Sequence, residues 1–130
     1  MRTVFADTFY FIAQFNPADE AHVRAKAFTD SFDGQLITTE WVLVEVGDAF
    51  SRLPNRIRFV NFYQLLQRTS GIAIVPVELA GGFQLFANRP DKEWSLTDCL
   101  SFVAMQAAGI NEALTGDRHF EQAGFVALLR

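Results

Sequence analysis

Four acidic residues stand at places in the sequence where carboxylates can act together on a ligand: Asp7, Glu45, Asp98 and Asp117. Two of them follow short apolar runs, and a third lies in the first turn of a helical pattern. Carboxylate oxygens suit Mg²⁺ and Mn²⁺ as ligands. Such an ion can lower the pKa of a bound water and stabilise charge on a phosphate under attack. These residue types therefore suggest hydrolysis of phosphodiester bonds.

Three of these acids also have a purely structural explanation. Asp7 and Asp117 stand where the N-caps of following helices are expected. Asp98 lies three residues after Ser95, which is the acidic position of a capping-box-like helix start, where the helix dipole also favours it. Taken singly, each of the three is explained by capping without any catalysis.

Glu45 is harder to explain in that way, because it lies inside the nearly continuous apolar run 41–46. A carboxylate buried without a partner costs several kcal/mol once it is ionised. The next basic residue along the chain, Arg52, is more than a helical turn away. We therefore expect Glu45 to be protonated, paired with a cation or bound to a metal. In one cleft, two unit charges about 5 Å apart repel by roughly 3 kcal/mol, which a divalent cation would offset.

The elements that must position these acids alternate between strands and helices. We expect strands at 3–6, 35–38, 72–75 and 113–115, with a last edge strand at 125–128, and helices at 8–14, 17–32, 55–68, 77–88, 95–108 and 118–122. Segment 41–46 is ambiguous, since its β-branched residues favour a strand while Thr39 and Glu40 can start a helix. This alternation predicts an α/β fold with a mainly parallel sheet, which binds ligands beyond the carboxyl ends of its strands.

Length and composition limit the class of protein. With 130 residues, we expect one domain over residues 1–130, and a half-hydrophobic composition with 14 Phe excludes a disordered chain. The single cysteine, Cys99, cannot form an internal disulfide, which fits a cytoplasmic location. The N-terminus does not resemble a signal peptide, and no apolar stretch approaches the roughly 18 residues of a membrane span.

The distribution of charge leaves two interpretations open. A net charge of −4 argues against a simple basic nucleic-acid binder. However, the segment from Ala49 to Val77 contains no acid. It carries four arginines: Arg52, Arg56, Arg58 and Arg68. These arginines either form a solvated helix face or provide a local basic surface that contacts RNA or a partner.

Four segments together resemble the PIN-domain proteins, in particular the VapC-like toxin ribonucleases. Val4–Thr8 looks like the family's first strand, which ends in Asp followed by a small hydroxyl residue. Segments 39–46 and 95–102 resemble the helices that supply its Glu and its next Asp. Segment 114–120, followed by Ala-Gly-Phe, resembles its Thr-x-Asp-x-x-Phe ending. Each motif alone is weak, but the four occur in the family's order along nearly the whole chain.

This resemblance implies a three-layer α/β/α sandwich and a helix at the ambiguous segment 41–46. It also implies Mg²⁺- or Mn²⁺-dependent hydrolysis of RNA by the toxin of a toxin–antitoxin pair. Asp7, Glu45 and Asp98 would then be metal ligands, with Asp117 binding directly or through water. A catalytically silent PIN module that only binds RNA or a protein is the alternative. A phosphatase with Asp7 as nucleophile is disfavoured, because a second Asp two residues later is missing.

The resemblance also suggests supporting residues and partners. The hydroxyls of Thr8 and Thr115 are candidates to hold a ligand or a water. Arg118 and His119 follow Asp117 closely and either touch phosphate or are ordinary first-turn helix residues. The implied partners are an RNA substrate, a cognate antitoxin and a second copy of the chain in a homodimer.

Overall fold

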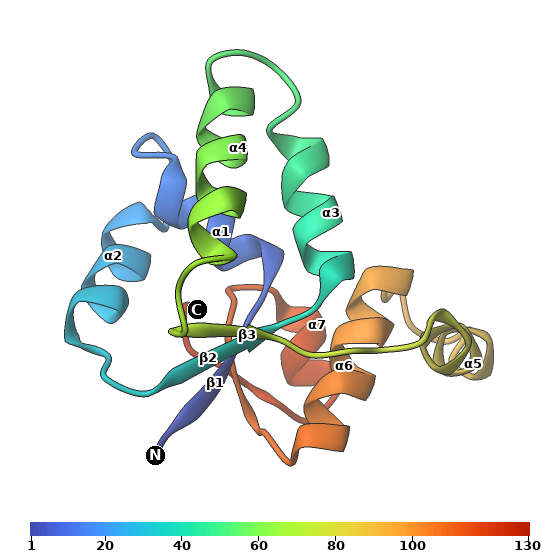
Figure 1. Ribbon diagram of the computed structural model, residues 1–130. Coiled ribbons are helices and arrows are strands. Elements are labelled where there is room, and N and C mark those ends of the chain that lie inside the picture. The colour runs from blue at the N-terminus through green and yellow to red at the C-terminus, as the bar shows by residue number, and fades with distance from the viewer.

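A five-stranded sheet forms the centre of the computed structural model, which describes residues 1–130 (Figure 1). The strands are β1 (Thr3–Ala6), β2 (Gln35–Thr38), β3 (Ile72–Ile74), β4 (Glu112–Leu114) and β5 (Val126–Ala127). Their order is β3-β2-β1-β4-β5, and every pairing is parallel. The expected parallel sheet is therefore confirmed, with β1 at its centre and β5 at the predicted edge.

Seven helices connect the strands, because parallel neighbours require long crossover connections. They are α1 (Thr8–Phe15), α2 (His22–Ser31), α3 (Glu40–Ala49), α4 (Asn55–Leu66), α5 (Leu79–Asn88), α6 (Leu96–Ala108) and α7 (Arg118–Gln122). Figure 1 shows α1 to α4 over one face of the sheet and α5 to α7 over the other. This arrangement confirms the three-layer α/β/α sandwich that the resemblance implied.

The ambiguous segment 41–46 is part of helix α3, so the strand interpretation is wrong. The hydroxyl of Thr39 accepts a hydrogen bond from the backbone N–H of Val42 at 3.2 Å, which caps the helix at the predicted residue. The expected helix at 17–32 is shorter than predicted and begins at His22. Before it, Asp19 accepts the backbone N–H of Ala21 at 2.8 Å, and this local bond favours a turn over a helix.

Helix α6 is the longest helix, with 13 residues. Its start has the complete capping box of Ser95 and Asp98, and its end has Gly109 in the left-handed conformation at φ 68°. Both ends match the sequence prediction. No helix in the structure combines the length and apolar character that crossing a membrane requires.

Aromatic side chains anchor α6 and α7 to the sheet. Phe102 of α6 meets Phe120 of α7 edge to face, with ring centroids 4.9 Å apart, and Phe120 also lies 6.5 Å from Phe5 of β1. All three side chains are at most 1% exposed. Burying each such side chain contributes roughly 1.5–3 kcal/mol. This packing holds α6 and α7 together, and one of the four acids stands at the start of each helix.

Candidate metal centre

The acidic residues lie near the switch point of the sheet, between β1 and β4. From β1 the chain first adds β2 and β3 on one side and then adds β4 and β5 on the other. Asp7 directly follows β1, and Asp117 comes three residues after the end of its neighbour β4. From these adjacent strands, α1 leaves over one face and α7 over the other (Figure 1). In open α/β sheets, the crevice at such a switch point is the usual place for a ligand.

Asp7 is a buried carboxylate that does not cap the helix after it, so the capping explanation is wrong for this residue. Its side chain makes no cap hydrogen bond, and Asp7 is only 6% exposed. Its Oδ2 instead accepts a hydrogen bond from Thr115 Oγ1 at 2.8 Å. Burial raises the pKa of Asp7 to about 7, against the Thr115 hydrogen bond, and the charges of Asp98 and Glu45 raise it further.

Asp98 combines a capping role with a position facing the other acids. Its Oδ2 accepts the backbone N–H of Ser95 at 3.1 Å, while Ser95 Oγ accepts the backbone N–H of Asp98 at 2.9 Å. The same Oδ2 lies 3.1 Å from His119 Nδ1. Burial raises the pKa of Asp98 and the charge of Asp117 adds to the rise, whereas the bonds from Ser95 and His119 oppose it. The capping prediction is therefore correct, but capping occupies only one carboxylate oxygen.

Thr115 joins two of the acids across the switch point. It is fully buried, and its Oγ1 donates to Asp7 while accepting the backbone N–H of Asp117 at 3.0 Å. Asp117 in turn uses Oδ1 to accept the backbone N–H of His119 at 2.8 Å, which confirms its predicted capping of α7. Because only Oδ1 of Asp117 accepts this bond, its second carboxylate oxygen is available to a ligand.

Glu45 lies on α3 and is exposed, so the argument from its burial is wrong. The helical period of α3 buries Val42 and Val46 but turns Val44 and Glu45 outward. Glu45 is nevertheless near enough to Asp7 for its charge to raise the pKa of that carboxyl group. Its charge therefore acts on Asp7 from a solvent-accessible position.

The donors of this centre fit a divalent cation. The ligand atoms of Asp98, Asp117 and His119 all lie within 4.8 Å of one another. At the start of α1, the buried hydroxyl Oγ1 of Thr8 has no hydrogen-bond partner. A carboxylate-rich set with an unpartnered hydroxyl suits a hard cation such as Mg²⁺ or Mn²⁺, and its charge would offset the mutual repulsion of the acids.

The two residues after Asp117 differ in their surroundings. Arg118 is exposed, whereas His119 is half-buried and turns its ring toward Asp98. This contact of His119 was missed in the sequence, where only the closeness of His119 to Asp117 gave a signal. The contact joins residues 21 positions apart, so it depends on how α7 packs against α6.

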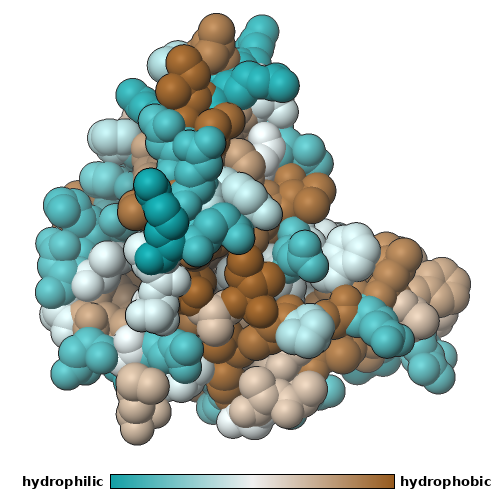
Figure 2. All heavy atoms as spheres, in the orientation of Figure 1, coloured by the Kyte–Doolittle hydropathy of each residue, from teal (hydrophilic) through white to brown (hydrophobic).

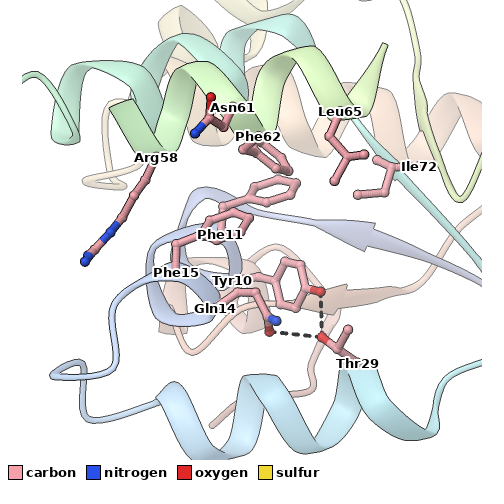
Figure 3. A pocket seen from close by; sticks show the side chains of 10 residues that line it. All are labelled: Tyr10, Phe11, Gln14, Phe15, Thr29, Arg58, Asn61, Phe62, Leu65 and Ile72. Carbon is pink, nitrogen blue, oxygen red and sulfur yellow. Dashed lines mark hydrogen bonds between the residues drawn. The ribbon is translucent and has the colours of Figure 1, made fainter. Parts of the chain in front are cut away.

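A cavity lies on the side of the sheet that carries α1 to α4 (Figure 3). It is a groove of about 480 Å³ between α1, α2 and α4. Its aromatic floor places Phe62 of α4 against Phe15 and Phe11 of α1, with ring centroids 4.7 and 5.4 Å apart. On the α2 side, the hydroxyls of Tyr10 and Thr29 share a hydrogen bond of 2.7 Å. The groove is thus apolar at its floor and polar at one margin.

The four arginines of the acid-free segment are all exposed, and none forms a salt bridge. Arg58 lines the groove and donates to Asn55 Oδ1 at 3.1 Å, while Arg56 donates to the backbone oxygen of Ser51 at 3.0 Å. The segment therefore presents uncompensated positive charge beside an apolar groove. It lies on α4 and its flanks, outside the acidic centre.

Comparisons with known proteins cover almost the whole chain. The PIN domain family matches residues 4–126. The 23S rRNA-specific endonuclease VapC20 from two strains of Mycobacterium tuberculosis is 27% identical over 125 residues, which are 95% of this chain and 95% of the relative. The crystal structure of Mycobacterium tuberculosis VapC20, described as a Sarcin-Ricin loop cleaving toxin, superposes with a TM-score of 0.85 at 25% identity. It covers 95% of this chain and 96% of that one.

Proposed function

Because the chain belongs to the PIN-domain family, we propose that it is a metal-dependent endoribonuclease and the toxin of a toxin–antitoxin pair. The observation that carries this proposal is the meeting of Asp7, Asp98 and Asp117 at the switch point of the sheet, with Glu45 beside them. Similarity along nearly the full length to a 23S rRNA-specific endonuclease supports RNA as the substrate class.

In this proposal Asp7, Glu45 and Asp98 hold Mg²⁺ or Mn²⁺, and Asp117 binds directly or through a water. When bound, such an ion lowers the pKa of a water and stabilises charge on the phosphate. Thr115 keeps Asp7 oriented through the 2.8 Å hydrogen bond.

Two further residues support the site from its margin. The unpartnered hydroxyl of Thr8 is available to hold a water beside Asp7. The exposed Arg118 stands next to Asp117, where it can contact an RNA phosphate.

Cleavage of a hairpin RNA that carries the sarcin–ricin sequence tests the activity. We expect cleavage with Mg²⁺ or Mn²⁺, none with chelator, and a loss of at least about a hundredfold in Asp98→Asn. Asp48→Asn, which changes an exposed acid of α3, is the matched control and should keep full activity. Undiminished cleavage by Asp98→Asn would contradict the proposed role of the acidic centre in RNA cleavage. Binding of the hairpin without any cleavage would favour the catalytically silent module, which has no need of a convergent acidic set.

We place the antitoxin in the groove between α1, α2 and α4. The apolar floor of the groove and the unpaired Arg58 at its margin fit a peptide that carries both apolar and acidic side chains. Among the exposed apolar residues of α4, Leu65 lines the groove itself and is 53% exposed. Ile57, on the same helix, is 56% exposed. Large exposed apolar patches of this kind commonly mark interfaces.

Leu65→Glu tests that placement, because it puts a charge on the groove wall without disturbing a buried residue. Calorimetric titration with the protein encoded beside this chain should show at least about a tenfold loss of affinity. Val23→Glu is the control, since Val23 is 76% exposed on α2 and does not line the groove. Equal affinities in the two variants would move the antitoxin to another surface.

A homodimer is the remaining part of the proposal. Leu79, Phe83 and Phe86 of α5 are exposed by 47%, 59% and 46%, and their spacing puts them on one face of the helix. Figure 2 shows apolar atoms reaching out onto the projecting α5 at the right of the molecule. Light scattering should give a dimer at micromolar concentration and a monomer for Phe83→Glu. A monomeric parent protein would contradict this part alone.

A cytoplasmic location completes the proposal. It is supported by the single cysteine, Cys99, which is free and fully buried in α6.

A further inference from the structure

The side chain of His119 lies between two carboxylates of the acidic centre. Its Nδ1 is 3.1 Å from Oδ2 of Asp98 and 3.5 Å from Oδ1 of Asp117. The backbone N–H of the same residue donates to Asp117 Oδ1 at 2.8 Å. His119 thus contacts an acid at the start of α6 and an acid at the start of α7, and its own side chain is 21% exposed.

The contact with Asp98 determines which carboxylate oxygen stays free. Oδ2 of Asp98 accepts both the Ser95 backbone N–H and His119 Nδ1, each at 3.1 Å. With Asp98 ionised, its Oδ2 only accepts, so Nδ1 donates the proton of this bond. The terminal torsion of an aspartate is otherwise broad, and two donors on one oxygen restrict it. The Oδ1 atom of Asp98 is consequently left for a ligand.

Contacts other than that of His119 also hold α7 against α6. The rings of Phe102 and Phe120 hold the two helices together through the core, with centroids 4.9 Å apart. Beside them, Trp94 Nε1 donates to Gln122 Oε1 at 3.1 Å and ties the segment before α6 to the end of α7. The contact of His119 is therefore additional to the packing between α6 and α7, and its effect is on the orientation of the Asp98 carboxylate.

We propose that His119 is a positioning residue, whose Nδ1–H holds Asp98 so that the second oxygen of this carboxylate faces the metal. This inference rests on the proposed metal-dependent function and assigns His119 a role other than contact with RNA. Hydrogen-bond partners that orient a metal ligand typically change metal affinity by about 10–100-fold when they are removed.

Mn²⁺ binding, measured by calorimetry without RNA, tests the proposal in three variants. His119→Ala removes the donor and should weaken binding at least about tenfold. His119→Asn places an amide N–H near the position of Nδ1–H and should restore binding to within about threefold of the parent protein. His22→Ala is the control, because its Nδ1 contacts only the backbone oxygen of Ala13, and its affinity should not change.

The nitrogen environment of bound Mn²⁺ gives a second, spectroscopic readout. If His119 only positions Asp98, electron spin echo measurements will show no directly coordinated imidazole nitrogen. A nitrogen coupling that disappears in His119→Asn would make the residue a ligand and overturn the positioning role.

The Mn²⁺ affinities of the variants can also overturn the positioning role. His119→Ala binding Mn²⁺ within twofold of the parent protein would overturn the inference, as would His119→Asn binding as weakly as His119→Ala. Circular dichroism of the metal-free proteins checks that each variant folds. If His119→Ala does not fold, the Mn²⁺ affinity of His119→Asn is compared with that of the parent protein, and a loss of more than threefold overturns the inference. A parent protein that binds no Mn²⁺ would instead overturn the proposed metal-dependent function.

Discussion

Helices α6 and α4 have nearly the same length, with 13 and 12 residues, but they are held in the molecule in different ways. Six residues of α6 are buried, whereas Leu66 is the one buried residue of α4. The capping box at Ser95 closes the start of α6, and α4 begins without any side-chain cap. Figure 1 shows α4 standing above the sheet beside α3, while α6 lies against the sheet.

The difference separates the two proposed roles in space. A metal centre needs ligands held by rigid elements, and α6 supplies this through burial and capping. A surface for a partner needs exposed apolar and charged side chains, and α4 supplies these at Ile57, Leu65 and Arg58. The well-packed helix α6 thus carries Asp98 at its start, whereas the lightly packed helix α4 leaves its side chains free to bind a partner.

The largest expected effect comes from truncating the same residue type in both helices. Leu100 of α6 is 2% exposed, so Leu100→Ala should lower the free energy of unfolding by about 2–5 kcal/mol through lost burial and a cavity. Leu65 of α4 is 53% exposed, and Leu65→Ala should change the free energy of unfolding by no more than about 0.5 kcal/mol. Urea unfolding measures both. Similar losses would show that α4 is packed as firmly as α6.

The second effect is a gain of stability on the acidic side when no metal is present. Burial raises the pKa of Asp7 from 3.8 to about 7, so the folded state binds this proton more tightly than the unfolded chain. This contribution is fully present below pH 3.8 and is lost as the pH rises through about 7. With chelator, Asp7→Asn should therefore become more stable than the parent protein by a few kcal/mol toward pH 8, and equal to it near pH 4.

Urea titrations at several pH values measure this difference. Asp48→Asn, which neutralises an exposed acid of α3, should show no comparable pH dependence and serves as the control. A gain that stays constant from pH 4 to pH 8 would contradict the burial of a charged Asp7.

The third effect concerns a buried hydroxyl on the acidic side and an exposed one beside the groove. Thr115→Val leaves Asp7 Oδ2 and the backbone N–H of Asp117 without their partner, which should cost about 1–3 kcal/mol. Thr29→Val removes an exposed hydroxyl on α2 and should cost less, about 0.5–1 kcal/mol. Thermal unfolding compares the two, and a larger loss in Thr29→Val would reverse the ranking.

The smallest effect compares the starts of the two helices. Ser95→Ala removes the cap of α6 and should cost about 1 kcal/mol. Asn55→Ala, at the first residue of α4, removes no cap and should change the stability by less than about 0.5 kcal/mol. If the two substitutions cost the same in urea unfolding, the start of α6 has no special stability.

Local sequence patterns were sufficient for most elements. The apolar runs predicted β1 and β2 with their observed bounds, and Ser95 with Gly109 predicted both ends of α6. Capping and strand formation depend on residues a few positions apart, so the sequence contains their signals directly. Segment 41–46 is different, since β-branched residues fit both structures and only the resemblance indicated a helix.

From the sequence we also predicted four acids for one centre, but part of the physical reasoning behind that prediction was wrong. Glu45 was expected to be buried because apolar residues surround it along the chain, yet the helical period of α3 exposes it. Capping of α1 was the structural explanation for Asp7, yet its side chain bonds to Thr115, 108 positions away. Neighbours along the chain indicate that a helix forms. Which of its sides is buried depends on the elements that pack against it.

Tertiary structure decided how the acids are brought together. Asp7 and Asp117 meet because β1 and β4 pair in parallel and so end at the same edge of the sheet. Thr115 bridges them only in that register, and His119 reaches Asp98 only because α7 packs on α6. The sequence by itself determined four carboxylates and the elements that carry them. The pairing of distant strands and helices determined the raised pKa of Asp7 and the one free oxygen of Asp98, since burial and long-range hydrogen bonds exist only in the folded chain.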